Sequence, residues 1–541
     1  MELRAQLQNL RAGDVLTPAH VRDYSRDASL FEVHPSAVVA PRNAADLKKL
    51  VHFVTIHPGL SLTARAAGTD MTGGPLSESI VVDMTFYFDQ IRTVGNGFAV
   101  TQPGVYYRTF EKETLKKGWL LPSYPASREI CTVGGMVANN SGGEKTLTYG
   151  QTKEYVRALK VVLADGNEYE IKPLKRHELD LKTSQRNFEG ELYRKMWDLV
   201  HENHAFLESH RPTVSKNSAG YYLWDIWDGE TFDLTKLFTG SQGTLGIISE
   251  ITFGLVKPKK HAKLLVIFLK NLEQLGHIAA TVLRYKPESF ESYDDKTLAI
   301  AIRFLPNFVK LLGTNFLKLA WQFLPEVGMV ISNGFRLPKL ILMAEFTGDS
   351  EKEVDEKMNK ALWAVQKFNI TARITKNETE MQKYWTIRRE SFNLLRHHVP
   401  GQRTAPFIDD MVVQPMYLPK FLPELEKILE PYHLRYSIAG HIGNGNFHII
   451  PLMKIGDPRI ATIIPEISKK VYDAVLKYHG SITGEHNDGM IRTPFLKQMY
   501  GEKMYQLFER TKEIFDPNNI FNPGKKVGGN FEYSMAHIQT G

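Results

Sequence analysis

Two glycine-rich segments in the N-terminal half constrain the fold of this chain more than any other feature. They are ARAAGTDMTGG at residues 64–74 and PASREICTVGGMVANNSGG at residues 125–143. Glycine adopts positive φ and lets the backbone approach a ligand closely. Successive N–H groups in such loops form concavities that bind anions. Each segment taken alone is also explained as a tight turn, but two of them favour a cradle for a pyrophosphate.

Neither segment fits the two common nucleotide-binding motifs. A Walker A loop needs a GK[ST] sequence, and the dinucleotide fingerprint needs G-x-G-x-x-G between a strand and a helix. The runs around the segments are rich in β-formers and bounded by Gly, Pro or Asp. They do not alternate strictly with helices, so a mixed α+β architecture is expected.

The pattern restarts after the basic cluster KPKKHAK at residues 257–263, which marks a domain boundary. Beyond it, strand and helix patterns alternate and predict a second α+β domain with an antiparallel sheet. Asn43 is expected to cap one helix in the first domain, and Asp349 or Ser350 to cap another in the second. The predicted units are an N-terminal helical segment at 1–22, a first domain at 23–258, a second at 259–465, and a C-terminal helical segment at 466–541 that returns to the first domain.

Composition excludes several classes of protein. The chain has 541 residues with a net charge of +7, and Cys131 is its single cysteine. Intrachain disulfides and cysteine-ligated iron–sulfur clusters are therefore excluded. We find no secretory signal, no apolar run of about 20 residues and no nucleic-acid motif, so a cytoplasmic protein without a nucleic-acid partner is expected.

Residues 303–335 form an apolar, aromatic stretch interrupted by lysines and Pro325. One interpretation is an insertion that docks the protein on the inner face of a membrane, because amphipathic segments with lysines bind at the interface. The alternative is that the stretch packs on its own domain or on a twin subunit.

Two further glycine-framed motifs, HIGNGNFH at 441–448 and GEHNDG at 484–489, carry metal-capable side chains. The Gly-Asn-Gly-Asn centre of the first disfavours a helix. A strand–turn–strand hairpin would bring His441 and His448 across from each other. Two imidazoles and the carboxylate of Glu485 are suitable ligands for a divalent metal such as zinc. A metallohydrolase would use the same cluster but would leave the glycine loops unexplained.

Several segments together resemble the FAD-linked D-2-hydroxy acid dehydrogenases, a branch of the vanillyl-alcohol oxidase type. They are the two glycine loops, YGQTKEYVRALKVVLADG, GSQGTLGIISEITF, HIGNGNFH, GEHNDG and IFDPNNIFNPGK, in family order from Asp23 to Lys526. The resemblance implies a PCMH-type FAD-binding domain of two subdomains, followed by an α+β cap domain with an antiparallel sheet. It also implies flavin oxidation of a 2-hydroxy acid, D-configured and D-lactate-like.

The resemblance places FAD on the two glycine loops and the GTLGI segment. The first loop has no histidine, so noncovalent FAD is expected. The implied contacts are Arg65, Ala66, Ala67, Gly68, Thr69, Asp70, Met71, Thr72, Pro125, Thr132, Gly134, Gly135, Asn139, Asn140, Gly142, Gly243, Gly246, Ile247 and Asn522.

In the family, the two histidines and the glutamate bind the metal and the next histidine acts as base, which implies His486 here. Two positions depart from the family pattern. Asn444 stands where the family has aspartate, which removes a carboxylate near the proposed ligands. Asn487 stands where the family has glycine, and asparagine tolerates the left-handed conformation that the turn needs.

Substrate capture requires a cation for the carboxylate, and arginine is suited to bidentate binding. Arg388 in YWTIRRESF matches the family's substrate arginine, and Arg403 is a second candidate without a counterpart. For both, a surface ion pair is the alternative. Electrons would pass to an external quinone, cytochrome or flavoprotein carrier. A vanillyl-alcohol oxidase-type enzyme for another alcohol, and a flavin-binding protein without turnover, stay open as alternatives.

Overall fold

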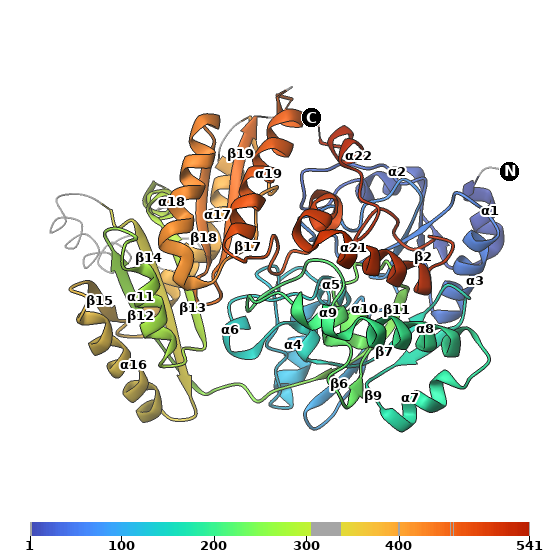
Figure 1. The fold of residues 1–541 in the computed structure, drawn as a ribbon, viewed down its shortest axis with the longest axis horizontal. Helices are drawn as coiled ribbons and strands as arrows, with labels where there is room; N and C mark the ends of the chain where they lie inside the picture. Colours follow the sequence, from blue (N-terminus) through green and yellow to red (C-terminus); the bar gives the residue numbers. More distant parts are fainter. Residues whose placement is uncertain (1–2, 304–336, 399–400, 455, 458, 540–541) are drawn as a thin grey trace.

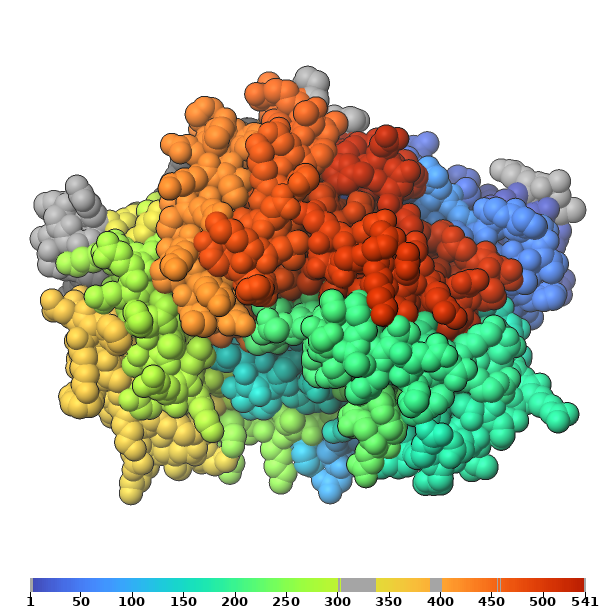
Figure 2. Space-filling view, viewed as in Figure 1, coloured from blue at the N-terminus to red at the C-terminus, as the bar shows by residue number. Residues whose placement is uncertain are grey.

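The computed structural model describes residues 3–303, 337–398, 401–454, 456–457 and 459–539. Two β-sheets and their helices make up the N-terminal part, at the right of Figure 1, and a large sheet with its helices lies at the left. The C-terminal helices, red in Figures 1 and 2, lie over the N-terminal part. This mixed architecture, with an antiparallel large sheet in the second domain, agrees with the predicted fold class.

The first sheet is small and carries the first glycine segment at its edge. Its order is β1 (Asp14–Val15), β2 (Ala37–Ala40), β4 (Ile80–Asp83), β3 (Leu62–Arg65). Strands β2, β4 and β3 are parallel, and β1 lies within the segment predicted as helical. Helix α1 (Leu3–Leu10) and helix α3 (Ala44–Thr55) belong to this part, and Asn43 caps α3 by accepting from the backbone N–H of Asp46, as predicted.

The second sheet is antiparallel throughout. Its order is β5 (Ile91–Val94), β6 (Phe98–Thr101), β11 (Ile247–Gly254), β7 (Val156–Val162), β8 (Glu168–Ile171). A short ribbon pairs β9 (Leu174–Lys175) with β10 (Thr231–Phe232). The other helices of the N-terminal part are α2 (Pro18–Val21), α4 (Tyr107–Lys116), α5 (Val133–Asn139), α6 (Thr146–Tyr149), α7 (Arg176–Thr183), α8 (Phe188–Glu202), α9 (His204–Ser209) and α10 (Thr235–Phe238).

The large sheet has helices on both faces. Its order is β15 (Thr371–Ile374), β12 (His261–Leu269), β14 (Leu340–Gly348), β13 (Ser289–Asp294), β18 (Arg435–His441), β19 (Asn446–Lys454), β16 (Gln402–Thr404), and β17 (Met411–Val412) also pairs with β19. Its helices are α11 (Leu275–Leu283), α12 (Asp295–Arg303), α16 (Glu351–Gln366), α17 (Glu378–His398), α18 (Leu418–Leu429) and α19 (Ile460–Lys477). Ser350 caps α16.

Strand β12 is a continuous apolar run because helices cover both faces of the large sheet. Leu265 and Ile267 pack into the core formed with α11, α16, α18 and α19, whereas Leu264 and Val266 pack into a second core with α17. Alternate strand residues point to opposite faces, so a strand covered on both sides is apolar at every position.

After α19 the chain returns to the N-terminal part. Helix α20 (Gly489–Arg492) follows the GEHNDG motif, α21 (Leu496–Phe515) packs on α8, and α22 (Phe531–Ala536) comes last. Phe521 forms a parallel bridge with Leu62 at the edge of the first sheet. Apart from Arg303, the predicted insertion lies outside the described residues. Within the described ranges, no helix has the length and apolarity needed to cross a membrane.

Candidate active site

One cavity of about 960 Å³ runs between the N-terminal part and the large sheet. The two glycine segments form one wall, with Gly68 and Gly135 among the lining residues. Side chains from β13, α17, β18, β19 and the GEHNDG turn form the other. Its size lies at the upper end of the range for pockets that enclose organic ligands and cofactors, about 300–1,000 Å³.

The HIGNGNFH motif is a β-hairpin, as predicted. Strands β18 and β19 pair around a short 3₁₀ turn at residues 442–444, and Gly445 has a φ of +68°. The register pairs His441 with Asn446 and His448 with Ala439. The two histidines are therefore diagonal neighbours on one face rather than direct partners. Their rings meet edge to face with centroids 5.3 Å apart.

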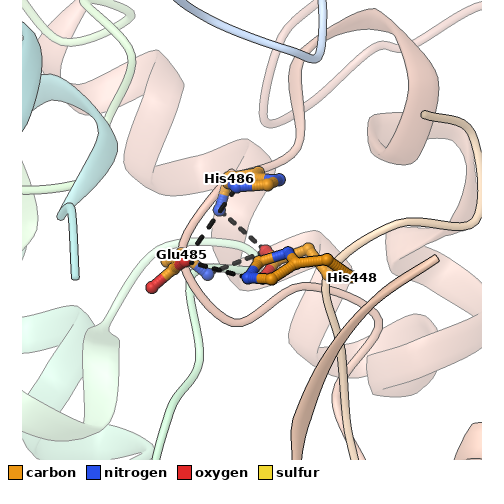
Figure 3. Close-up of side chains that lie close together, drawn as sticks. His448, Glu485 and His486 are labelled. Atoms are coloured by element: carbon orange, nitrogen blue, oxygen red, sulfur yellow. Dashed lines mark hydrogen bonds and ion pairs between the residues drawn. The ribbon is translucent and has the colours of Figure 1, made fainter. Parts of the chain in front are cut away.

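Three imidazoles converge on one carboxylate oxygen. Glu485 Oε1 lies 3.1 Å from His441 Nε2, 3.3 Å from His448 Nε2 and 4.0 Å from His486 Nε2. Figure 3 shows His448, Glu485 and His486 facing one another. Ligand atoms that share a metal at about 2.0–2.2 Å lie roughly as far apart as Glu485 Oε1 and the Nε2 atoms of His441 and His448. The side chains whose ligand atoms all lie within 4.8 Å of one another are Asp410, His448, Glu485 and His486.

A buried aspartate lies behind two of these histidines. Asp409 Oδ1 is 3.2 Å from His448 Nδ1, and Asp409 Oδ2 is 2.7 Å from His486 Nδ1. The two rings stack with centroids 4.9 Å apart. Burial alone would lower the pKa of His448, but Asp409 and Glu485 outweigh it and raise that pKa to about 10. Burial would also lower the pKa of His486, but the charges of Asp410 and Asp409 outweigh burial and raise that pKa.

The neighbouring Asp410 holds the GEHNDG turn in place. Its Oδ2 accepts from the backbone N–H groups of Gly484, Glu485 and His486 at 2.8, 2.8 and 2.7 Å. Asp410 also lies within 4.8 Å of the ligand atoms of His448, Glu485 and His486. Because these N–H groups already use its carboxylate, Asp410 holds the turn in place, and His441 stays the predicted third ligand.

Lys216, from the N-terminal part, is fully buried against this turn. Its ammonium donates to Glu485 Oε2 at 2.6 Å and to Asn446 Oδ1 at 3.0 Å. Burial would raise the pKa of Glu485, but Lys216 and His441 outweigh burial and take that pKa well below its usual value. Glu485 is therefore ionised, with a single oxygen left to face the imidazoles.

The two positions that depart from the family pattern have different surroundings. Asn444 donates to the Ser215 hydroxyl at 3.0 Å, so its amide does not support either histidine. Asn487 has a φ of +72°, which confirms the expected left-handed turn. Its amide donates to the carbonyls of Asn139 and Gly240 at 3.2 and 2.9 Å. The substitution thus ties the turn to the second glycine segment.

Comparison with known proteins assigns two domains to this chain. Residues 35–172 match the family model of the FAD binding domain, and residues 258–526 match that of the C-terminal domain of FAD linked oxidases. The chain belongs to the FAD-linked oxidases. The match to the FAD binding domain bears out the predicted flavin site.

Relatives of this FAD-linked oxidase include two hydroxy acid dehydrogenases. The D-2-hydroxyglutarate dehydrogenase of Escherichia coli (strain K12) is 24% identical over 93% of the chain and 49% of the relative. The D-lactate dehydrogenase of Anaerostipes hadrus is 26% identical over 93% and 92%. The chain spans about half the length of the first group of curated relatives it matches. The solved structure of p-cresol methylhydroxylase has the same fold, with a TM-score of 0.68, 16% identity and 98% of each chain covered.

Eleven of the flavin contacts implied by the resemblance line the cavity of this FAD-linked oxidase. They are Ala66, Ala67, Gly68, Thr69, Asp70, Met71, Pro125, Thr132, Gly135, Asn139 and Gly142. The other eight are not among the residues that line it: Arg65, Thr72, Gly134, Asn140, Gly243, Gly246, Ile247 and Asn522.

Several of those eight have structural partners that explain their place. The guanidinium of Arg65 donates to the carbonyls of Tyr24 and Arg26 at 3.0 and 2.6 Å. A Cβ on Gly134 would lie 2.4 Å from Pro103 Cβ, so this glycine faces Pro103. Asn522 donates to the carbonyls of Gly74 and Gln242, and these hydrogen bonds hold the end of the first glycine segment in place.

The two candidate arginines separate in space. Arg388, on α17, lines the cavity, and its Nη2 lies 3.1 Å from Glu291 Oε2. Its buried Nε has no hydrogen-bond partner among the described residues. Arg403, on β16, lines a different, smaller cavity beside Ser29, and its charge acts on Glu32. The geometry favours Arg388 over Arg403 as a group that faces the histidines.

Sequence reasoning missed Lys216, Glu291, Asp409 and Asp410. Paired aspartates in the apolar run FIDDMVV, and a glutamate inside the strand SFESYD, were available signals. A charge within a buried strand pattern indicates a paired or functional group, because burial of an unpaired charge is costly. Lys216 gave no comparable signal, since it lies in a loop.

Proposed function

We propose that this FAD-linked oxidase oxidises a D-2-hydroxy acid to the 2-oxo acid. The observation that carries the proposal is the continuity of the cavity. The flavin-binding glycine segments and the cluster of His441, His448, Glu485 and His486 line one space. FAD bound along the glycine segments would accept the hydride that leaves carbon 2 of the substrate.

Each part of the charged cluster suits one part of such a substrate. Arg388 offers a guanidinium for the carboxylate. His486 in its neutral form offers Nε2 as the acceptor of the hydroxyl proton, because its Nδ1 lies 2.7 Å from Asp409 Oδ2, which would hold the imidazolium that forms. The hydroxyl proton and the hydride together balance the two-electron oxidation.

A divalent metal held by His441, His448 and Glu485 would make the hydroxyl easier to deprotonate. The donor set supports it. Glu291 and Asp409 contact the Nδ1 atoms of the two histidines at 2.6 and 3.2 Å, so each Nε2 faces Glu485. Carboxylates behind metal-binding histidines are a common feature of metal sites, where they fix the ring orientation. Zinc is the candidate ion.

The electrons would leave through an external acceptor such as a quinone, a cytochrome or a flavoprotein carrier. A membrane surface would suit a quinone, and the segment proposed to dock there lies outside the described residues. Sedimentation with anionic vesicles at low salt tests that part, because a protein that stays in the supernatant has no such affinity.

The visible spectrum of the purified protein tests the proposed function. We expect a flavin spectrum that bleaches anaerobically on addition of D-lactate or another D-2-hydroxy acid, and more slowly with the L-isomer. A flavin that no 2-hydroxy acid reduces would contradict the proposal and favour another alcohol substrate or a protein without turnover. A colourless protein would favour the metallohydrolase.

A further inference from the structure

One buried carboxylate links the two halves of the charged cluster. Glu291 lies on β13, lines the cavity, and has a relative exposure of 1%. Its Oε1 is 2.6 Å from His441 Nδ1, and its Oε2 is 3.1 Å from Arg388 Nη2. Both oxygens are therefore in use, one on each neighbour.

Sheet register explains how Glu291 reaches this place. Strand β13 pairs with β18 through Ser292↔Gly440 and Tyr293↔Ala439. Continued by one residue, the same register sets Glu291 opposite His441. Cross-strand neighbours have Cβ atoms about 4.5–5.5 Å apart, so their side chains meet on the same face. Helix α17 covers that face and brings Arg388 to the second oxygen.

We propose that Glu291 is a positioning residue that determines selectivity for acids with an oxygen on carbon 2. This inference rests on the proposed function. Because one carboxylate spans His441 and Arg388, the distance between the metal-ligand cluster and the guanidinium is fixed by a single side chain. A ligand whose carboxylate and second oxygen are on adjacent carbons matches that distance. A plain carboxylic acid engages Arg388 alone.

Two substitutions separate this role from simple charge balance. Glu291→Gln keeps the length and an oxygen for His441, but it turns an amide toward Arg388. Glu291→Asp keeps the charge but is shorter by one methylene, so it cannot reach both neighbours. A spanning role predicts that both variants lose selectivity, whereas a charge-balancing role predicts that Glu291→Asp retains it.

The experiment measures how tightly oxidised, FAD-loaded protein binds pyruvate and propionate by isothermal titration calorimetry. The two probes differ only in the oxygen at carbon 2, and neither donates a hydride. We expect wild type to prefer pyruvate, and both Glu291 variants to reduce that preference on the order of tenfold, because a hydrogen bond to a charged group is lost. The divalent metal content of each variant is measured in parallel.

Glu288→Gln is the matched control. Glu288 is a buried glutamate in the same segment and pairs with Lys145 at 2.6 Å, but it does not line the cavity. Its variant should keep the preference for pyruvate. An unchanged preference in folded, flavin-containing Glu291→Gln, or full retention in Glu291→Asp, would overturn the inference. Flavin bleaching by D-2-hydroxy acids is scored separately, so failure of the proposed function is recognised independently.

Discussion

The two walls of the cavity are built in opposite ways. The glycine wall, residues 66–74 and 132–142, presents mainly backbone and small side chains. The charged wall, formed by Glu291, Arg388, His441, His448, Glu485 and His486, presents side chains that are paired with other charges. The first wall leaves room for a ligand, whereas the second fixes reactive groups.

This difference determines how each wall tolerates change. On the glycine wall a new side chain takes up space. A Cβ on Gly74 would lie 2.4 Å from Asp70 Oδ2, for example. On the charged wall the loss of one group leaves its partner buried and unpaired, which costs more than the pair itself contributed. The glycine wall should therefore be sensitive to size and the charged wall to charge.

Removal of the proposed base gives the largest expected effect. His486→Ala should retain FAD, because the histidine lies on the charged wall, but flavin reduction by a D-2-hydroxy acid should slow by about 10²–10⁴-fold. Stopped-flow absorbance measures the reduction rate. The exposed His277 on α11 provides the control variant His277→Ala. Reduction by His486→Ala at a rate near that of wild type would show that another group takes the proton.

Two adjacent glycines test the size sensitivity of the other wall. Gly135 lines the cavity, and a Cβ added to it would lie 3.3 Å from Ala66 Cβ, so Gly135→Leu should give folded protein that lacks FAD. Gly134 faces Pro103, so Gly134→Leu should instead impair folding. The flavin-to-protein absorbance ratio and circular dichroism distinguish the two results. Full flavin content in Gly135→Leu would remove this residue from the flavin site.

Lys216 tests the charge sensitivity. Lys216→Met leaves Glu485 Oε2 without its buried cation, and breaking a buried pair costs about 3–5 kcal/mol of folding stability. Added Zn²⁺ should restore part of the loss, because an ion on Glu485 supplies the missing positive charge. Thermal unfolding with Zn²⁺ or with a chelator measures both effects. A variant as stable as wild type in the chelator would show that the pair contributes little.

The smallest effect is expected at the boundary between the two parts. Burial raises the pKa of Glu345 to about 7, against the opposing effect of Lys145. The folded protein then binds the proton of the Glu345 carboxyl more tightly than the unfolded chain does. The stability that this proton contributes is present below about pH 4.5 and is lost as pH rises to about 7. Glu345→Gln should flatten that decline. Denaturation at several pH values measures the free energy of unfolding of wild type and Glu345→Gln. If both free energies change in parallel with pH across this range, the prediction is wrong.

The sequence by itself determined much of the framework. Glycine frequency marked the loops, because few other residues adopt positive φ or allow close approach. Asn43 and Ser350 were readable as helix caps from local chemistry, and the Gly-Asn-Gly-Asn centre indicated a hairpin. These features depend on neighbours in the chain, so their physical cause is local. The motif residues His441, His448, Glu485 and His486 were found in the same way.

Only the tertiary structure decided which groups support that set. Glu291 reaches His441 through the register of β13 with β18, and Lys216 reaches Glu485 across 269 positions of the chain. Asp409 and Asp410 act on a turn more than seventy positions away, with separations of 74 to 76 for the backbone contacts of Asp410. No local pattern encodes such pairs, because the energy that holds them comes from mutual burial of opposite charges in the folded protein. The tertiary structure also decided that Arg388 lines the large cavity and that Arg403 lies outside it.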